Sequence, residues 1–401
     1  MTAATDVTPM SRAAREGTTW SILVMLSIAH MLNDTMQSVI AASYPILKDA
    51  FALDYGQIGV VTMCFQVTAS VLQPLVGIVT DRHPMPFSLA IGMGSTLIGL
   101  ILMSIAPTYA VLLVAVGLIG TGSAVFHPES SRMARLASGG RHGLAQSLFQ
   151  VGGNTGSALG PLLATFVVLP FGRPSVAWFA GLALAGIALL TRVGLWGRER
   201  RVVRAPGATR PTSGLPKAIV VRSIAVLMLL VFSKNVYLAS ISSFYTFYLI
   251  DTFGVTVREA QLYLFVFLFA SALGTLVGGP VGDRIGRKAV IWVSILGVLP
   301  FTLALPHVGL AMTAVLSVAI GLIMSSAFSA ILVFAQELVP GRVGMIAGLF
   351  FGMAFGFGGL GAAALGEIAD RTSIATVYQI AAWLPAIGIL TVFLPNLKKA
   401  G

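Results

Sequence analysis

Two opposite charges lie deep inside long apolar stretches of the sequence: Asp34 in the first stretch and Lys234 in a later one. Asp34 follows Trp20 by 14 residues, or about 21 Å along a helix at ~1.5 Å per residue. A charge at the centre of a bilayer costs about 2.5 to 3.5 kcal/mol on insertion scales, so such residues are usually kept for function. A carboxylate that water reaches from each side in turn can carry a proton, and a buried ammonium can attract an anionic substrate.

Each of these charges also has a purely structural interpretation. Asp34 could be permanently hydrogen-bonded, for example to Asn33, and Lys234 could serve only in an ion pair. A salt bridge between Asp34 and Lys234 is a further possibility in the absence of substrate, and protonation of Asp34 would break it.

Three further charged or titratable groups lie near one another in the fourth apolar stretch, and one lies beside Asp34. His30 is one helical turn before Asp34 and could orient its carboxylate or relay its proton, or it could be a neutral packed histidine. Glu129 and Arg132 are three residues apart on a helix and can pair. Glu129 or His127 could be a second proton site, with Arg132 attracting an anionic group. The alternative is a cytoplasmic gate in which these charges hold helix ends together.

Uncharged polar side chains in the same stretches are candidate substrate contacts, because amides and hydroxyls can both donate and accept hydrogen bonds. Hydrogen bonds between helices are their more common use in membranes. The candidates for substrate binding are Asn33, Gln66, Gln150, Asn154, Tyr237 and Tyr245.

The composition is that of a membrane protein. Of 401 residues, 56% are hydrophobic and 10% are charged, against roughly 25% charged in soluble domains. The net charge of +11 is spread over short loops, which argues against a nucleic-acid partner. A single cysteine, Cys64, excludes an intramolecular disulfide and a CxxC site. The sequence lacks HExxH, Walker and Asp-rich motifs, so we expect no enzyme, no metal site and no cofactor.

Hydropathy predicts an all-α protein with twelve transmembrane helices in two six-helix bundles. The bundles are 20–196 and 221–396, joined by a polar cytoplasmic linker, 197–220, and flanked by cytoplasmic tails, 1–19 and 397–401. The predicted spans are 20–47, 57–79, 87–105, 109–133, 143–169, 176–196, 221–250, 259–280, 289–305, 309–337, 343–366 and 377–394.

The distribution of lysine and arginine predicts the orientation of these spans. With the N-terminus in the cytoplasm, the tails, the linker and the other cytoplasmic connections hold 20 positive charges, and the opposite side holds four. Cytoplasmic loops carry such an excess. We therefore expect both termini in the cytoplasm.

The two halves repeat each other at a nearly constant offset. The segment Gly77-Ile-Val-Thr-Asp81-Arg82 matches Gly279-Pro-Val-Gly-Asp283-Arg284, shifted by 202, and Lys234 is offset by 200 from Asp34. Parallel repeats of this kind place a substrate path at their interface, as in transporters that rock one bundle against the other.

The repeated Gly-x-x-x-Asp-Arg loop, found after the second and eighth spans, resembles the signature of the major facilitator superfamily. A narrower resemblance, to the fosmidomycin-resistance branch of that superfamily, rests on His30-Met-Leu-Asn33-Asp34, on Phe126-His127-Pro128-Glu129-Ser130-Ser131-Arg132 and on Gly139-Gly140-Arg141-His142-Gly143.

This resemblance implies a proton-driven exporter, a drug/proton antiporter of a small phosphonate antibiotic, that acts as a monomer in the lipid bilayer of a bacterial inner membrane. It also implies that Asp81, Arg82, Asp283 and Arg284 are conformational locks, each carboxylate meeting a helix N-terminus or an arginine across the halves. A proton-coupled importer of a small organic anion or sugar would share the twelve spans and the repeated loops, and it is the alternative function.

Overall fold

The computed structural model describes residues 17–53, 55–200 and 213–397, and within these ranges the chain is helical with no strand. The first half contains α2 (Trp20–Ala42), α3 (Tyr44–Phe51), α4 (Tyr55–Arg82), α5 (Ser88–Ile105), α6 (Tyr109–Ala137), α7 (His142–Leu163), η1 (Ala164–Val168), α8 (Leu169–Phe171), η2 (Arg173–Phe179) and α9 (Ala180–Glu199). The second half contains α10 (Lys217–Phe253), α11 (Val257–Ile285), α12 (Arg287–Ile295), α13 (Leu299–Ala304), η3 (Leu305–His307), α14 (Leu310–Ser325), α15 (Ala327–Leu338), α16 (Val343–Arg371), α17 (Ile374–Ala381) and η4 (Leu384–Phe393).

Each of the twelve predicted spans corresponds to one helix or to a run of shorter ones. The tenth, for example, is divided into α14 and α15 at Ser326. Ten helical stretches in the described ranges are long and apolar enough to cross a bilayer. The long helices α2 and α7 are not among them, because polar side chains lower their hydropathy.

Several helices extend beyond the predicted spans. The helix α9 continues to Glu199 and α10 begins at Lys217, so both enter the stretch predicted as linker. Hydropathy cannot detect these turns because their side chains are charged and can leave the apolar layer. Parts of the predicted tails and linker, with Arg12, Arg15, Arg201, Arg204, Arg210, Lys398 and Lys399, lie outside the described residues.

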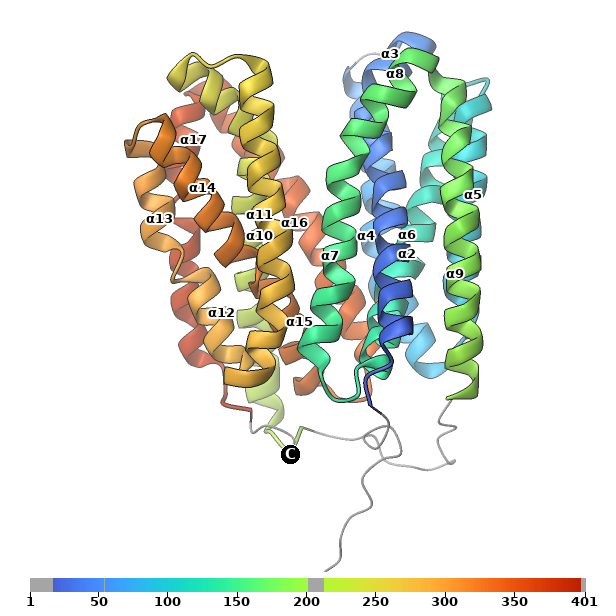
Figure 1. Cartoon of the computed structure of the whole chain (residues 1–401), viewed down its shortest axis with the longest axis vertical. Coiled ribbons are helices and arrows are strands. Elements are labelled where there is room, and N and C mark those ends of the chain that lie inside the picture. Colours follow the sequence, from blue (N-terminus) through green and yellow to red (C-terminus); the bar gives the residue numbers. More distant parts are fainter. Residues whose placement is uncertain (1–16, 54, 201–212, 398–401) are drawn as a thin grey trace, which may run out of the picture.

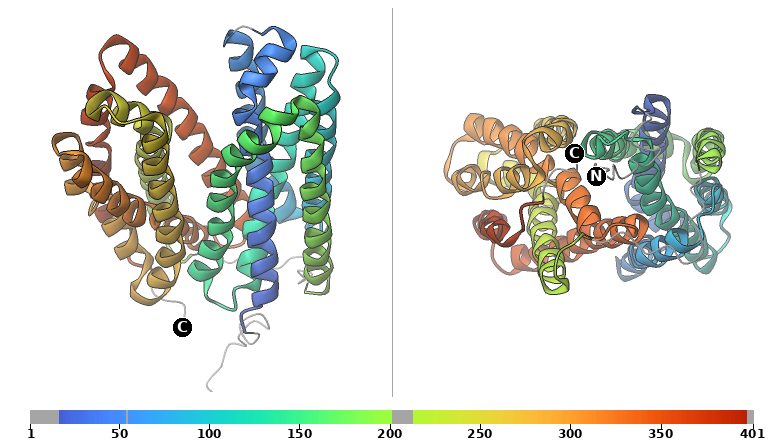
Figure 2. Two further views of the ribbon diagram at one scale, coloured as in Figure 1. Left: turned by 45° about the horizontal axis from the view of Figure 1, so that its top comes forward. Right: turned by 90° about the horizontal axis from the view of Figure 1, so that it is seen from below.

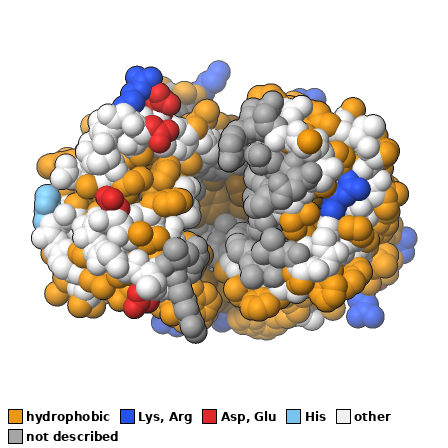
Figure 3. All heavy atoms as spheres, turned by 90° about the horizontal axis from the view of Figure 1, so that it is seen from above, with side chains coloured by type: hydrophobic (Ala, Val, Ile, Leu, Met, Phe, Trp, Pro, Cys, Tyr) orange, Lys and Arg blue, Asp and Glu red, His pale blue; other side chains and the backbone are white. Residues whose placement is uncertain are grey.

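The two halves form two bundles side by side (Figure 1). They converge at the end where α2 begins and separate toward the opposite end (Figure 2). Across the boundary, α4 packs on α16 and α7 packs on α11. Seen from the separated end, the surface is hollowed between the halves (Figure 3). We call the two ends of the molecule the closed end and the open end.

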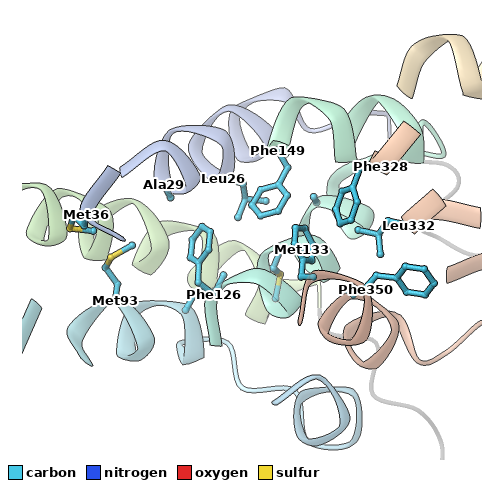
Figure 4. Close-up of a cluster of buried hydrophobic side chains, with 14 of the residues drawn as sticks. Leu26, Ala29, Met36, Met93, Phe126, Met133, Phe149, Phe328, Leu332 and Phe350 are labelled. Carbon is cyan, nitrogen blue, oxygen red and sulfur yellow. The ribbon is translucent and has the colours of Figure 1, made fainter. Parts of the chain in front are cut away.

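The hydrophobic core of the first half continues into the second half. Phe149 of α7 and Phe351 of α16 have ring centroids 6.2 Å apart, and Phe351 also meets Phe328 of α15 at 5.2 Å. Figure 4 shows Phe149, Phe328 and Phe350 in this cluster, with Phe126 of α6 nearby. The halves are therefore joined by a continuous apolar contact as well as by polar groups.

Close packing of α2 on α7 requires glycine at defined positions. A Cβ atom on Gly152 would lie 1.9 Å from the carbonyl oxygen of Ser27, and one on Gly156 would lie 2.2 Å from that of Met31. Small residues allow membrane helices to approach this closely. This contact fixes α2, and with it Asp34, against the first half.

We expect Gly156→Ala to destabilise the protein, because backbone would have to move to admit the methyl group, at a cost of ~1–3 kcal/mol. The thermal unfolding midpoint of the detergent-solubilised protein should fall by several degrees. Gly181→Ala is the matched control, since a Cβ there meets nothing within 4 Å. An equal midpoint in the two variants would contradict the packing role of Gly156.

Candidate functional site

Two helices bring two histidines to one carboxylate. On α2, His30 Nε2 lies 3.3 Å from Asp34 Oδ2, and on α6, His127 Nε2 lies 3.6 Å from Asp34 Oδ1. Asn33 and Gln37 donate their amide hydrogens to Asp34 Oδ1 at 3.0 and 3.4 Å. The imidazole side chains are 1% and 0% exposed and the Asp34 side chain is 11% exposed, so solvent reaches this group of residues through the carboxylate. We call His30, Asp34 and His127 the His–Asp–His cluster.

The backbone fixes the tautomer of both histidines. His30 Nδ1 lies 2.7 Å from the carbonyl oxygen of Phe149, and His127 Nδ1 lies 3.0 Å from that of Ser123. A carbonyl oxygen can only accept, so each Nδ1 carries the hydrogen. In a neutral imidazole the Nε2 lone pair then points toward Asp34. If the cluster held no proton beyond those on Nδ1, the Nε2 lone pairs would face the carboxylate oxygens of Asp34, and both are hydrogen-bond acceptors. The geometry therefore favours a proton or another cation between them.

Aromatic rings enclose the cluster. His30 stacks on Phe149 with centroids 4.1 Å apart, and His127 lies 5.0 and 5.3 Å from the rings of Phe351 and Phe355 on α16. The second half therefore contributes part of the wall around groups that belong to the first half. A movement of α16 relative to α6 would change the surroundings of His127.

Glu129 and Arg132 form an ion pair on α6, and Arg132 Nε donates to Glu129 Oε2 at 2.9 Å. The Glu129 side chain is fully buried and that of Arg132 is 20% exposed. No ion pair or hydrogen bond in the described chain joins Glu129 to His127 or Asp34. Both members of the pair lie within electrostatic range of Asp81. Asp81 lies at the closed end, as described below, and the pair is therefore near that end. This position favours the gate interpretation over a proton relay through Glu129.

Lys234 is buried on α10, with 6% of its surface exposed, and its ammonium lies 5.5 Å from the centre of the Phe328 ring. The expected salt bridge to Asp34 is not present, because Asp34 is paired with the two histidines instead. No acidic side chain of the described chain forms an ion pair with Lys234. The site therefore offers a cation that an anion entering between the halves can neutralise.

The uncharged candidates have different positions. Asn33 contacts Asp34 directly. Asn154 of α7 donates to Thr275 of α11 at 2.9 Å and so joins the halves. Gln66 is half-buried beside Gly359 of α16. The side-chain amide oxygen of Gln150 is buried and has no hydrogen-bond partner among the residues that the structure describes.

Tyr237 and Tyr245, the two tyrosine candidates for substrate binding, are buried in this conformation, and their contact with substrate stays a prediction. They are 1% and 0% exposed and belong to the hydrophobic core of the second half. Helical periodicity alone could not decide this, because α10 has apolar neighbours on most of its circumference.

Two aspartates join the halves at the closed end. Asp81 of α4 accepts hydrogen bonds from the backbone N–H groups of Gly344 and Met345 at the start of α16, at 3.0 and 2.8 Å. Asp283 of α11 accepts from Gly143 and Leu144 at the start of α7, both at 3.0 Å. A carboxylate at a helix N-terminus satisfies free N–H groups and meets the positive end of the helix dipole.

The arginine that pairs with Asp283 is Arg287, at 3.0 Å, and Arg287 also reaches Glu337 at 3.2 Å. Arg82 and Arg284, which follow the two aspartates in the sequence, are both exposed. The carboxylates of Asp81 and Asp283 thus meet helix N-termini of the opposite half, and Asp283 has Arg287 as an added partner.

A further polar network at the closed end was not evident from the sequence. Arg135 of α6 donates to Gln336 of α15 at 3.2 Å, and Gln336 donates to Ser131, also at 3.2 Å. Arg135 and Gln336 are separated by 201 residues, which is close to the offset of the repeat. That relation is the signal that could have identified the pair.

Comparison with known proteins agrees with the fold. The model of the Major Facilitator Superfamily matches residues 26–254 and 227–400. The chain is 57% identical over 380 residues, 94% of each chain, to the fosmidomycin resistance protein of Escherichia coli strain K12. It is 39% identical to the uncharacterized MFS-type transporter YfnC of Bacillus subtilis strain 168, covering 96% of this chain and 95% of that one.

Among solved structures, FucP in its outward conformation superposes with a TM-score of 0.74 at 17% identity, covering 93% of this chain and 98% of FucP. The chain belongs to the Major Facilitator Superfamily. It is a multi-pass membrane transporter of a small molecule, and it is not an enzyme.

We expect Glu129→Leu to destabilise the protein by about 3 kcal/mol, because it leaves the partly buried guanidinium of Arg132 without its partner. Adding Arg132→Leu should recover most of this loss, since replacing a buried pair by apolar groups is often neutral. Thermal unfolding of both single variants and the double variant in detergent measures the coupling. Additive losses would contradict the pairing.

Proposed function

We propose that this protein is a proton-driven antiporter that exports a small antibiotic, with the phosphonate fosmidomycin as the substrate to test first. The His–Asp–His cluster carries the proton part of this proposal, because its three facing acceptors need a shared proton. The substrate part rests on the relative named for fosmidomycin resistance and on the buried, unneutralised ammonium of Lys234.

The open end faces the periplasm in this proposal. The helix α2 begins and η4 ends at the closed end (Figure 1), and the excess of lysine and arginine belongs to the connections on that side. Positive loops remain in the cytoplasm. The structure then corresponds to the outward-facing conformation, and a proton from the periplasm reaches the cluster through the exposed edge of Asp34.

The transport cycle alternates between two arrangements of the halves. In the inward-facing form the anionic drug binds from the cytoplasm near Lys234. In the outward-facing form the drug leaves toward the periplasm, and the cluster then takes up a proton from that side. The proton is delivered to the cytoplasm when the halves rock back. This cycle needs only a cluster that is accessible from one side at a time.

Asp81 and Asp283 act as locks of the outward-facing form. Each carboxylate crosses from one half to a helix N-terminus of the other, so opening of the closed end must break both sets of hydrogen bonds. Arg82 and Arg284 follow these carboxylates in the repeated motif, at the ends of α4 and α11. Loss of either aspartate would shift the balance between conformations rather than remove a substrate contact.

The membrane potential is sufficient to drive such an exchange. Each charge that moves inward is worth about 2.3 kcal/mol per 100 mV. One proton entering while a monoanion leaves moves two charges, or about 4.6 kcal/mol, which sustains more than a thousandfold gradient at ~1.4 kcal/mol per decade.

We expect Asp34→Asn to abolish proton movement driven by fosmidomycin in proteoliposomes, because the amide cannot take up the shared proton. Exchange of labelled drug for unlabelled drug needs no net proton and should persist. The measurement is the change in an internal pH dye on addition of drug. Asp251→Asn removes an exposed acid outside the cluster and should leave coupling intact.

Unchanged coupling in Asp34→Asn would remove the central assignment. The direction of transport in inverted membrane vesicles separates export from the alternative, an importer of a small organic anion or sugar. Accumulation inside inverted vesicles supports export, and depletion supports import.

We expect Lys234→Gln to weaken fosmidomycin binding by about tenfold to a hundredfold, because a hydrogen bond to a charged group is worth ~1.5–3 kcal/mol. The measurement is the KM for transport, with Lys217→Gln as a control at an exposed lysine. A KM that is unchanged in Lys234→Gln would show that the ammonium does not contact the drug.

A further inference from the structure

The ligand atoms of the His–Asp–His cluster are spaced for a metal ion. One ring nitrogen of His30, one of His127 and a carboxylate oxygen of Asp34 lie within 4.8 Å of one another. Metal–ligand distances of ~2.0–2.1 Å in a tetrahedral zinc site place neighbouring ligand atoms ~3.3–3.4 Å apart. His30 Nε2 lies 3.3 Å from Oδ2 of Asp34, and His127 Nε2 lies 3.6 Å from Oδ1. The carboxylate would therefore hold one ion by turning toward it or by binding through both oxygens.

The groups around the cluster already orient these atoms as ligands. Metal-binding histidines usually donate their second ring N–H to a carbonyl or carboxylate. Both histidines do so here, because their Nδ1 atoms donate to the backbone carbonyl oxygens of Phe149 and Ser123. The amides of Asn33 and Gln37 hold the carboxylate.

His127 Nε2 is the ligand atom of the cluster with the longest contact to the carboxylate. This atom is buried and faces Asp34 Oδ1 at 3.6 Å, a distance longer than that of a normal hydrogen bond. A buried polar atom without a partner costs about 1–3 kcal/mol. A cation bound between the three side chains would satisfy it.

We propose that the cluster binds one divalent cation of the zinc class, through His30, Asp34 and His127. Two imidazoles and one carboxylate suit zinc and cobalt, whereas magnesium and calcium prefer oxygen ligands. The exposed edge of Asp34 is the entry route and leaves the fourth position for water or a substrate oxygen. The ligands come from two helices far apart in the sequence, which is why no metal motif is visible there.

The test is binding of Zn²⁺ to the purified full-length protein in detergent, prepared without a histidine tag. Cys64→Ser serves as the background because it removes the sole thiol of the chain. We expect one Zn²⁺ per chain by equilibrium dialysis, and a loss of affinity of about tenfold to a hundredfold or more in His30→Gln and in His127→Gln.

The exposed histidines His83 and His307 provide matched controls, and His83→Gln and His307→Gln should bind as the background does. Co²⁺ should give the visible absorption of a four-coordinate site in the background protein, which reports the site without any substitution in it. Absence of both signals, or Zn²⁺ binding that survives in His127→Gln and in His30→Gln, would overturn the proposal.

Bound Zn²⁺ should also arrest transport when it is added on the open side, an effect that rests on the proposed function. Metal binding itself requires neither drug nor proton gradient, so the two proposals can fail separately. Zn²⁺ bound by the background protein together with proton coupling retained in Asp34→Asn would sink the proton role alone. Absence of Zn²⁺ binding together with loss of proton coupling in Asp34→Asn would overturn the metal site alone.

Discussion

The whole arrangement depends on how a carboxylate is kept inside a membrane. A buried charge is tolerated only when it is paired and hydrogen-bonded. Here Asp34 is held by two imidazoles and two amides, and the imidazoles are themselves held by backbone carbonyls of α6 and α7. The close approach of α2 to α7 through glycine is what allows His30 to reach its carbonyl on Phe149. Packing and electrostatics are therefore inseparable at this site.

The carboxylates at the closed end are also held by hydrogen bonds. Asp81 and Asp283 cross between the halves in opposite directions, and each ends on the free N–H groups of a helix start. These contacts are reciprocal because the halves are repeats. Carboxylate and helix N-terminus are complementary without any arginine. Each of these hydrogen bonds depends on the two halves being close together at this end.

The two halves differ in the surroundings of their buried charges. Asp34 and Lys234 occupy nearly equivalent positions, yet the first is surrounded by polar partners and the second faces an aromatic ring. One half thus holds an acid with several polar partners, and the other holds a lysine over an aromatic ring.

The sequence by itself determined the membrane class, the all-helical fold and the family, because apolar length and repeated motifs are properties of the linear chain. It also singled out Asp34 and Lys234, since any charge in such a stretch is conspicuous. Only the tertiary structure decided the partners. It joined His127 to Asp34, gave Asp34 two histidines in place of a possible bridge to Lys234, and buried Tyr237 and Tyr245 in a core. These outcomes depend on the rotation and closeness of helices that are distant in sequence, and helical periodicity does not specify which neighbour a given face will meet.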